Sequence, residues 1–372
     1  MSESPDPPDS ERPAGALRYG WTTGACAAAA SRAAAEALLT GWFPETVSIT
    51  LPRGHKPVFA LARTELADDR ATAGIIKDAG DDPDVTHGAL ICATVERGPP
   101  GGGVAFRAGD GVGTVTRAGL PLAPGEPAIN PKPREQIRQA LRDAVAAAGA
   151  GDTALDFIVT VSIPGGAELA KKTLNSRLGI VGGLSVLGTT GIVVPFSCSA
   201  WIHSIHRGID VARAAGLTHI AASTGSTSEA AIQAMYKLDE MALIDMGDFA
   251  GGMLKYLRSH PVPRLTIAGG FGKLAKLAAG HLDLHSGRSQ VDVAGLAVCL
   301  ADLGLPAERV AAASQAASAG EVLTIAGEDR GRLAALIARR ARDVALATLA
   351  GDVAVDVAVF DRGGVLLGHA TP

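Results

Sequence analysis

The segment from Lys77 to Gly88, KDAGDDPDVTHG, carries the most unusual chemistry of the sequence, because four of its residues are aspartates. Carboxylates this close together repel one another, so in a sheltered site at least one should have a raised pKa unless cations or amide donors compensate. Asp, Gly and Pro are also common turn residues, so two interpretations stay open, a functional site and a solvated acidic turn. The carboxylates concerned belong to Asp78, Asp81, Asp82 and Asp84.

A glycine-rich segment, AGGFGKLA from Ala268 to Ala275, follows a predicted strand and opens a helical pattern. Free amides and the positive end of a helix favour a phosphate or carboxylate at such a place, and glycine permits close approach. Gly270, Gly272 and Lys273 are therefore candidate ligand contacts. A plain tight turn explains the same residues, and a Walker loop is excluded because Leu274 follows the lysine.

Two further turns combine glycine with hydroxyl side chains. One runs from Leu187 to Gly191, and the other, from Ser223 to Glu229, follows a predicted strand. Ligands of open α/β sheets bind at the carboxyl ends of strands, which favours a ligand contact at the second turn. Capping of the next helix by Ser226, with Glu229 three residues later, explains that turn equally well.

Metal-binding and disulfide patterns are weak in this sequence. His281 and His285 would share one face of a helix, as would His203 and His206. No third ligand or H-E-x-x-H pattern accompanies them, and we expect no protein-bound metal. The four cysteines are widely separated and form no CxxC pair, which is typical of reduced, mostly buried thiols in a cytoplasmic protein.

The overall composition excludes several classes of protein. The 372 residues contain 34 Lys and Arg against 38 Asp and Glu, a net charge of −4, without the basic runs that nucleic-acid binding requires. With 47% hydrophobic residues the chain can bury a large core, and no apolar run is long enough for a membrane span. Residues 1–17 are acidic and proline-rich, which predicts a disordered tail rather than a signal peptide.

The order of predicted elements indicates an α/β (α+β) protein of two domains. Residues 18–180 form a sheet-rich α+β domain, with helices predicted from Thr23 to Leu39 and after Pro131. Residues 181–372 alternate strands with helices, which is typical of a parallel, Rossmann-like sheet. The strands are expected at 217–223, 242–245 and 264–268, the helices at 199–215, 226–238 and 248–259, and a hairpin that can pack on either domain at 353–370.

Several segments, taken in order, resemble the cobalt-precorrin-5B C(1)-methyltransferases of anaerobic cobalamin biosynthesis. Residues 20–30, GWTTGACAAAA, resemble the amino-terminal signature of that family, and the acidic segment resembles its next motif. GDGVGTVTRAGL, GEPAINPKPRE and the run at 168–197 follow in the family's order. The motifs cover Tyr19 to about Ser286, and Trp21 stands where the family commonly has Tyr. Little resemblance continues beyond about Gln290.

The resemblance implies transfer of a methyl group from S-adenosylmethionine to ring carbon C(1) of cobalt-precorrin-5B, giving cobalt-precorrin-6A. Cobalt would travel with this contracted tetrapyrrole rather than with the protein. The main task of the enzyme would be to hold the ring carbon and the methyl group in line. One carboxylate among Asp78, Asp81, Asp82 and Asp84 would stabilise the sulfonium or accept a proton.

The resemblance also implies two sets of ligand contacts, with the active cleft expected between the domains. The substrate carries peripheral carboxylates, which suit basic side chains and backbone amides. We expect it to contact Thr22, Thr23, Lys77, Lys171, Lys172 and Arg177. We expect S-adenosylmethionine in the parallel-sheet domain, although the macrocycle fits those loops too. Its expected contacts are Thr189, Thr190, Gly191, Ser223, Thr224, Gly225, Gly270, Gly272 and Lys273.

Two other classes of protein stay open. A non-catalytic carrier of a tetrapyrrole intermediate would bind the macrocycle without consuming S-adenosylmethionine. A nicotinamide-dependent oxidoreductase would use the turn at Gly270, but no ribose-binding acid lies at the expected distance from that turn. We expect a small corrinoid as partner, with no nucleic acid and no membrane. A homo-oligomer and transient contact with neighbouring pathway enzymes are both compatible with the sequence.

Overall fold

The computed structural model describes residues 16–150 and 155–372, and the chain divides into unit 1, Met1–Ser197, and unit 2, Cys198–Pro372. The mixed α/β class expected from the sequence is confirmed. Residues 180–193 belong with unit 1 because β10 (Ile180–Val181) pairs with β8 (Thr114–Val115), and β11 (Ile192–Val193) pairs with β1 (Gly20–Trp21). Of the expected tail, residues 1–15 lie outside the described residues.

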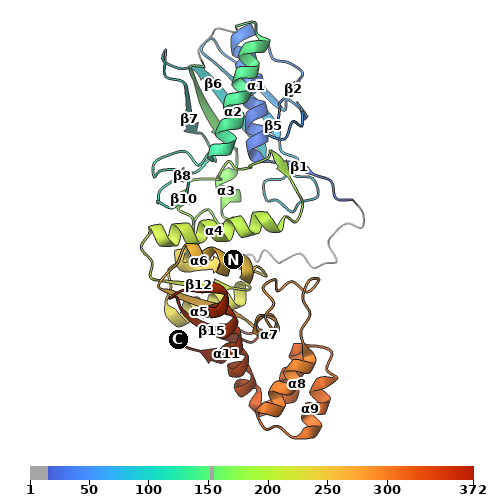
Figure 1. The fold of residues 1–372 in the computed structure, drawn as a ribbon. Coiled ribbons are helices and arrows are strands. Elements are labelled where there is room, and N and C mark those ends of the chain that lie inside the picture. Colours follow the sequence, from blue (N-terminus) through green and yellow to red (C-terminus); the bar gives the residue numbers. More distant parts are fainter. Residues whose placement is uncertain (1–15, 151–154) are drawn as a thin grey trace. The chain divides into compact units, whose positions relative to one another are not determined.

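Unit 1 is built on a five-stranded sheet with the order β4-β5-β6-β9-β7, one face of which is covered by two helices (Figure 1). Only β7 and β9 run parallel within this sheet. The strands β4, β5 and β7 were not expected from the sequence. The bounds are β4 Arg63–Leu66, β5 Arg70–Ile76, β6 Leu90–Arg97, β7 Val104–Ala108, β9 Phe157–Ser162, α1 Thr23–Thr40 and α2 Pro131–Ala147.

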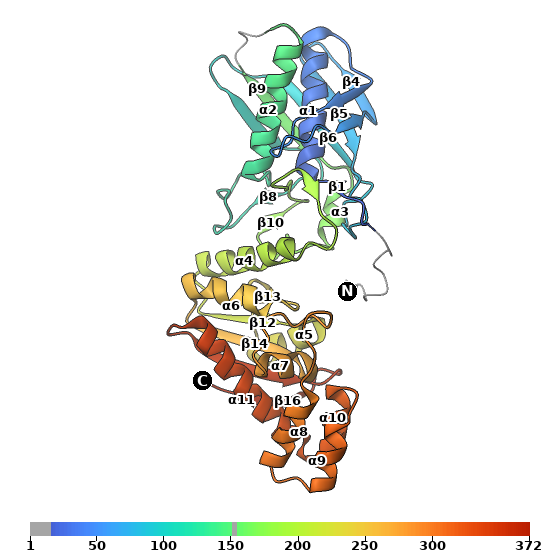
Figure 2. The same ribbon diagram turned by 45° about the vertical axis from the view of Figure 1, so that its right-hand side comes forward.

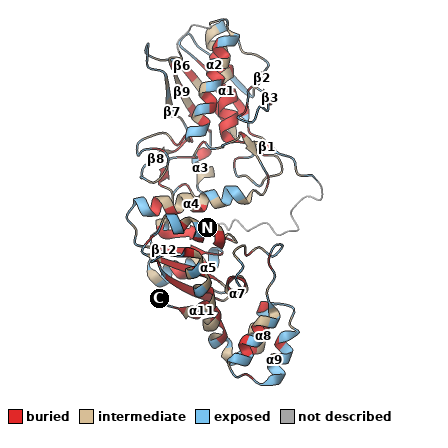
Figure 3. Cartoon of the chain, viewed as in Figure 1, coloured by how far each residue is buried: buried red, intermediate tan, exposed pale blue. Residues whose placement is uncertain are grey.

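The alanine-rich helix α1 is the centre of unit 1. All its alanines between positions 25 and 37 have 0% exposure, and Figure 3 shows how far the helix is buried. Small side chains let α1 lie close to both the sheet and α2. The helix ends close to the predicted Leu39, and its C-cap Gly41 adopts a φ of 86°. A hairpin of β2 (Thr46–Ser48) and β3 (Val58–Ala60) and the short α3 (Gly166–Ala170) complete the unit.

Unit 2 contains the predicted parallel sheet, with the order β13-β12-β14-β15-β16 (Figure 2). The first four strands are parallel, and β16 closes the predicted terminal hairpin as an antiparallel edge. Because the chain runs from β12 outward to β13 and then back to β14, the strand order reverses between β12 and β14. The bounds are β12 His219–Ser223, β13 Leu243–Asp245, β14 Arg264–Gly270, β15 Ala354–Phe360 and β16 Leu366–Ala370.

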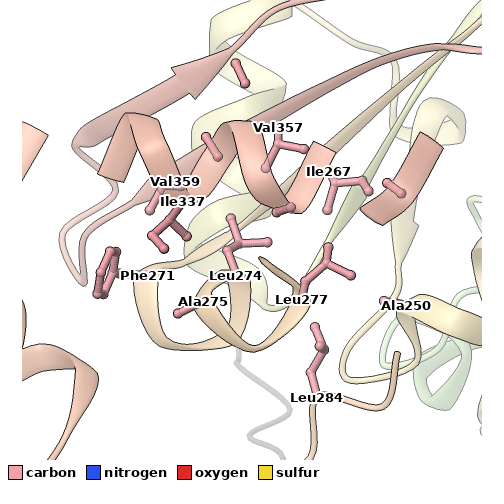
Figure 4. Close-up of a cluster of buried hydrophobic side chains, with 14 of the residues drawn as sticks. Ala250, Ile267, Phe271, Leu274, Ala275, Leu277, Leu284, Ile337, Val357 and Val359 are labelled. Carbon is pink, nitrogen blue, oxygen red and sulfur yellow. The ribbon is translucent and has the colours of Figure 1, made fainter. Parts of the chain in front are cut away.

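Helices cover both faces of this sheet, because alternate strand residues enter two separate cores. One helix, α5, packs on one face, and the larger core on the other face includes α4, α6, α7 and α11 (Figure 4). In the described residues no helix is long and apolar enough to cross a membrane. The bounds are α4 Cys198–Ala214, α5 Ser226–Tyr236, α6 Ala250–Ser259, α7 Phe271–Ala278, α8 Val293–Asp302, α9 Ala307–Ser314, α10 Ala319–Ala326 and α11 Arg330–Leu349, with 3₁₀ helices at Glu240–Ala242 and Gly327–Asp329.

A buried polar cluster ties the predicted terminal hairpin into the sheet. Asp356 of β15 has 0% exposure and accepts hydrogen bonds from Arg264 Nε (3.0 Å), Thr266 Oγ1 (2.9 Å) and Tyr236 Oη (2.8 Å). Burial alone would raise the pKa of Asp356, but these donors lower it below the usual range. The carboxylate therefore joins α5, β14 and β15.

Replacing this carboxylate is expected to destabilise unit 2. Asp356→Ala leaves Arg264, Thr266 and Tyr236 without their common acceptor, so the free energy of unfolding should fall by on the order of 3 kcal/mol at pH 7. Because the native pKa is lowered, the part of this loss that depends on the ionised carboxylate is fully present above the unfolded pKa near 3.9 and should shrink as the pH falls from there through the lower native pKa. Urea unfolding measures both effects, with the exposed Asp352→Ala as control. Equal losses in the two variants would contradict the assignment.

Candidate functional site

The acidic segment forms the loop between β5 and β6 and lies directly against the residues that precede α1. Trp21 N donates to the carbonyl of Asp78 (2.7 Å), and Asp81 N donates to that of Arg18 (3.0 Å). A Cβ on Gly20 would lie 2.0 Å from the carbonyl carbon of Ala79, so only glycine fits there. The residues before α1 and the acidic loop, which are far apart in the sequence, therefore pack directly against each other.

A buried lysine neutralises one of the four aspartates. Lys77 has 1% exposure, and its ammonium group contacts the carboxylate of Asp84 and, at 2.7 Å, Thr86 Oγ1. Asp84 also accepts from Thr86 N (2.7 Å) and Thr86 Oγ1 (2.6 Å). Burial would raise the pKa of Asp84, but Lys77 and the bonds from Thr86 lower it below the usual value. Asp84 is therefore an ionised structural anchor of the loop.

Arg18 holds two more carboxylates of the loop. Its guanidinium group contacts both oxygens of Asp78, and its backbone N–H donates to Asp81 Oδ2 (2.6 Å). The hydrogen bond from Arg18, followed by one from Gly80 N (2.9 Å), lowers the pKa of Asp78 to about 2. Asp78 therefore stays ionised and is poorly suited to accept a proton.

Asp82 differs from the other three aspartates. It accepts a hydrogen bond from Phe196 N (2.9 Å), and in the described part of the chain it forms no ion pair. Burial, and then the nearby charge of Asp84, raise the pKa of Asp82 above its usual value. The arrangement matches the sequence argument that at least one crowded carboxyl group has a raised pKa. Among the four, Asp82 is the one whose surroundings favour uptake of a proton.

The start of α1 borders this loop. Thr22 Oγ1 accepts from Ala25 N (3.2 Å) and so caps the helix, while Thr22 N donates to the carbonyl of Gly191 (3.0 Å). Thr22 and Thr23 are both buried. A Cβ on Gly188 would lie 2.3 Å from Thr22 Oγ1, so this turn lies tightly against the cap.

The turn at Thr189, Thr190 and Gly191 therefore lies in unit 1 and not in the parallel-sheet domain, where the sequence analysis placed it. The reason is the pairing of β11, which directly follows, with β1. Gln136 of α2, which the sequence analysis did not single out, has its side-chain nitrogen 3.4 Å from the carbonyl of Thr189. Its side-chain oxygen is buried without a hydrogen-bond partner among the described residues.

The expected basic group follows α3 in unit 1. Lys171 and Lys172 are exposed and Arg177 is half-buried. Lys171, the C-cap of α3, forms an ion pair with Glu168 of that helix (2.7 Å). The lysines thus face water, as a polyanion-binding group would, and one is already partly neutralised.

The second candidate site lies at the carboxyl edge of the unit 2 sheet, where β12 ends. Ser223, the last residue of β12, has 1% exposure, and its hydroxyl group has no hydrogen-bond partner in residues 16–150 and 155–372. Thr224 is also buried, and its N–H donates to the carbonyl of Ala268 (3.0 Å). The N-cap of α5 is Gly225, which has no side chain to satisfy the first amides. The predicted capping by Ser226 is wrong, since that residue already lies inside the helix.

The neighbouring turn after β14 also leads into a helix that begins at a glycine without a side-chain cap. Gly270 caps α7 without a side-chain hydrogen bond, and Gly272 lies in the first turn of that helix. A Cβ on Gly225 or Gly270 would meet no atom within 4 Å, so both turns border open space. Lys273 Nζ donates to the carbonyl of Thr224 (3.0 Å) and pairs with Asp248 (3.1 Å), which links the two turns. The sequence analysis missed Asp248.

The histidine pairs differ from each other. His203 and His206 both lie on α4, with their ring centroids 6.1 Å apart. His281 and His285 do not share a helix, because α7 ends at Ala278. The described residues contain no group of three or more His, Cys, Asp or Glu side chains that could hold a metal ion.

Comparison with known proteins gives consistent matches. The CbiD family matches residues 10–195, and the family described as CbiD, C-terminal domain, matches residues 283–371. A protein of Bradyrhizobium named cobalt-precorrin-5B C(1)-methyltransferase is 61% identical over 99% of this chain and 96% of its own length. A protein of that name from Paramagnetospirillum magneticum is 58% identical over 95% and 98%. A crystal structure titled cobalamin biosynthesis protein (cbiD), from Archaeoglobus fulgidus, shows 29% identity over 74% of this chain and 84% of that one, with a TM-score of 0.40.

The buried pair in the acidic loop is expected to behave as a coupled unit. Lys77→Met leaves Asp84 without its cation and should lower the free energy of unfolding by on the order of 3 kcal/mol, and Asp84→Asn should also destabilise. The double variant should lose less than the sum of the two single losses. Urea unfolding measures this coupling, and the exposed pair Lys171 and Glu168 serves as control, with an expected coupling below about 1 kcal/mol. Additive losses at Lys77 and Asp84 would exclude a coupled pair.

Proposed function

Since the chain belongs to the CbiD family, we propose that it methylates ring carbon C(1) of cobalt-precorrin-5B with S-adenosylmethionine as donor, giving cobalt-precorrin-6A in anaerobic cobalamin biosynthesis. The observation that carries this proposal is the 61% identity with a protein of that named activity over nearly the full length of both chains. We also propose a cytoplasmic location, which agrees with the four free cysteines.

The chemistry of the reaction sets two tasks for the protein. S-adenosylmethionine supplies an electrophilic methyl group on a sulfonium, whose sulfur keeps the electron pair when the bond to carbon breaks. The macrocycle forms a new bond to carbon and must then lose a proton for its charge to balance. The chain therefore has to align the two reactants and provide a proton acceptor.

Asp82 is the proposed proton acceptor in unit 1. Its carboxyl group has a raised pKa and no cation in contact within the described residues, while Asp78 and Asp84 are each paired with a cation. Asp78, Asp81 and Asp84 then hold the loop in shape. Lys77 is proposed to position the loop and not to bind the substrate directly, because its ammonium group is buried against Asp84.

The remaining unit 1 candidates are proposed to bind the macrocycle. Thr22 and Thr23 at the start of α1 lie beside the acidic loop, and the turn at 189–191 supports them through the hydrogen bond from Thr22 N. Lys171, Lys172 and Arg177 suit the peripheral carboxylates of the substrate.

S-adenosylmethionine fits the carboxyl edge of the unit 2 sheet. Ser223 offers a buried hydroxyl group without a partner among the described residues, and α5 and α7 begin there without side-chain caps. Two helix amino termini and Lys273 favour the carboxylate of its methionyl group. Thr224, Gly225, Gly270 and Gly272 would shape this site. The strand-order reversal between β12 and β14 is where open α/β sheets bind their ligands.

Methyl transfer to C(1) can be tested directly. Anaerobic incubation of the protein with cobalt-precorrin-5B and ¹³C-methyl S-adenosylmethionine should place one labelled methyl group on C(1), with S-adenosylhomocysteine formed in equal amount. Nuclear magnetic resonance of the product locates the label. Binding of the macrocycle without label transfer would contradict the proposal and favour a non-catalytic carrier.

Replacing the proposed proton acceptor should slow turnover without unfolding the protein. Asp82→Asn keeps the shape and the acceptor for Phe196 N but cannot take up a proton, so kcat should fall by about 10²- to 10⁴-fold. In the wild type the rate should fall as the pH drops through a pKa above the usual value near 3.9, because the protonated carboxyl group is inactive.

The exposed Asp68, in the turn between β4 and β5, provides the matched control. Asp68→Asn should keep the wild-type rate and pH profile. Near-normal turnover of folded Asp82→Asn would exclude Asp82 as the proton acceptor and leave the methylation proposal intact.

A further inference from the structure

Asp245 is a further carboxylate at the carboxyl edge of the unit 2 sheet. It is the last residue of β13, and in the sheet it is the register partner of Ser223, the last residue of β12. Residues in register on parallel strands point to the same face, so both side chains lie on the face that α5 covers, at the carboxyl edge. A carboxylate therefore stands next to the buried hydroxyl group of Ser223.

The backbone around Asp245 is held in place from two sides. Met246 N and Gly247 N both donate to the carbonyl of Ser223, at 3.0 and 3.2 Å. Trp201 Nε1 of α4 donates to the carbonyl of Asp245 (3.2 Å). The end of β13 is thus fixed against the end of β12, at the edge where α5 starts without a side-chain cap.

The β12-α5-β13 unit has the layout of a nucleoside-binding βαβ unit. In such units the first turn after a strand approaches the ligand, and an acid about 20 residues further on, at the end of the second strand, accepts hydrogen bonds from ribose hydroxyl groups. Asp245 follows Gly225 at about this spacing. The turn after β14, which holds Gly270, has no such acid at the expected distance, whereas the turn after β12 does.

We propose that Asp245 binds the ribose hydroxyl groups of the nucleoside part of the methyl donor and makes the site specific for a ribonucleoside. This inference rests on the proposed function, which places S-adenosylmethionine at the same edge. A carboxylate suits this role, since its two oxygens can accept hydrogen bonds from neighbouring hydroxyl groups. Ser223 and the start of α5 are left for the methionyl end of the ligand.

Calorimetric titration with S-adenosylhomocysteine and with its 2′-deoxy analogue tests this role. The wild type should bind the ribose form about 10- to 100-fold more tightly, because a hydrogen bond to a charged group is lost in the analogue. Asp245→Ala should bind S-adenosylhomocysteine more weakly by a similar factor and discriminate less than about 2-fold between the two ligands. Its affinity for the analogue should fall by a smaller factor, because only the hydrogen bond to the 3′ hydroxyl group is lost there.

The control is Asp239→Ala, which removes an exposed carboxylate before β13, at the opposite end of that strand. It should keep the wild-type preference. Asp245→Asn, the closest variant in shape, should also lose most of the preference, and it replaces Asp245→Ala if that variant does not fold. A folded Asp245 variant that discriminates like the wild type would overturn the role of Asp245 while the donor site stands. A wild type that binds neither ligand would overturn the donor proposal and this inference with it.

Discussion

A contact between two backbones determines the shape of the unit 1 site. The chain at Gly20 lies so close to Ala79 that a Cβ would overlap the peptide between Ala79 and Gly80. This contact places the acidic loop beside the start of α1, and the hydrogen bonds of Arg18 and Trp21 to the loop depend on it. The alanines of α1 also help to place the acidic loop beside the start of the helix, because their small side chains let α1 lie close to the sheet that carries the loop.

Once the loop is formed, its charges are distributed unequally. Lys77 neutralises Asp84 from the buried side, and Arg18 neutralises Asp78 from the exposed side. Asp82 receives an amide donor from Phe196 and no ion pair among the described residues, so burial, and after it the charge of Asp84, raise the pKa of this group. A single carboxyl group with a raised pKa, held by ionised neighbours, is the arrangement that acid-base chemistry uses.

The carboxyl edge of the unit 2 sheet also holds polar groups that lack hydrogen-bond partners among the described residues. Helices α5 and α7 begin at Gly225 and Gly270 without a side-chain cap, as α6, α9 and α11 do, whereas α8 and α10 are capped by Asp292 and Ser318. Uncapped amides and the unpartnered hydroxyl group of Ser223 cost stability unless a ligand satisfies them. The turns at Gly225 and Gly270 follow β12 and β14, the two strands between which the strand order reverses.

The sequence by itself determined the class of fold, the parallel sheet of unit 2, helices α1 and α2, and the family, because hydrophobic periodicity, helix-ending glycines and contiguous motifs are local features. The strands β4, β5 and β7 escaped prediction because β4 and β7 are largely exposed and β5 buries mostly alanine and glycine, so none of them shows a strong alternation of large apolar and polar residues. Only the tertiary structure decided which aspartate lacks a cation, that the turn at 189–191 lies beside Thr22, and that Asp245 stands next to Ser223. Each depends on contacts between segments distant along the chain, and local residue patterns carry no information about such distances.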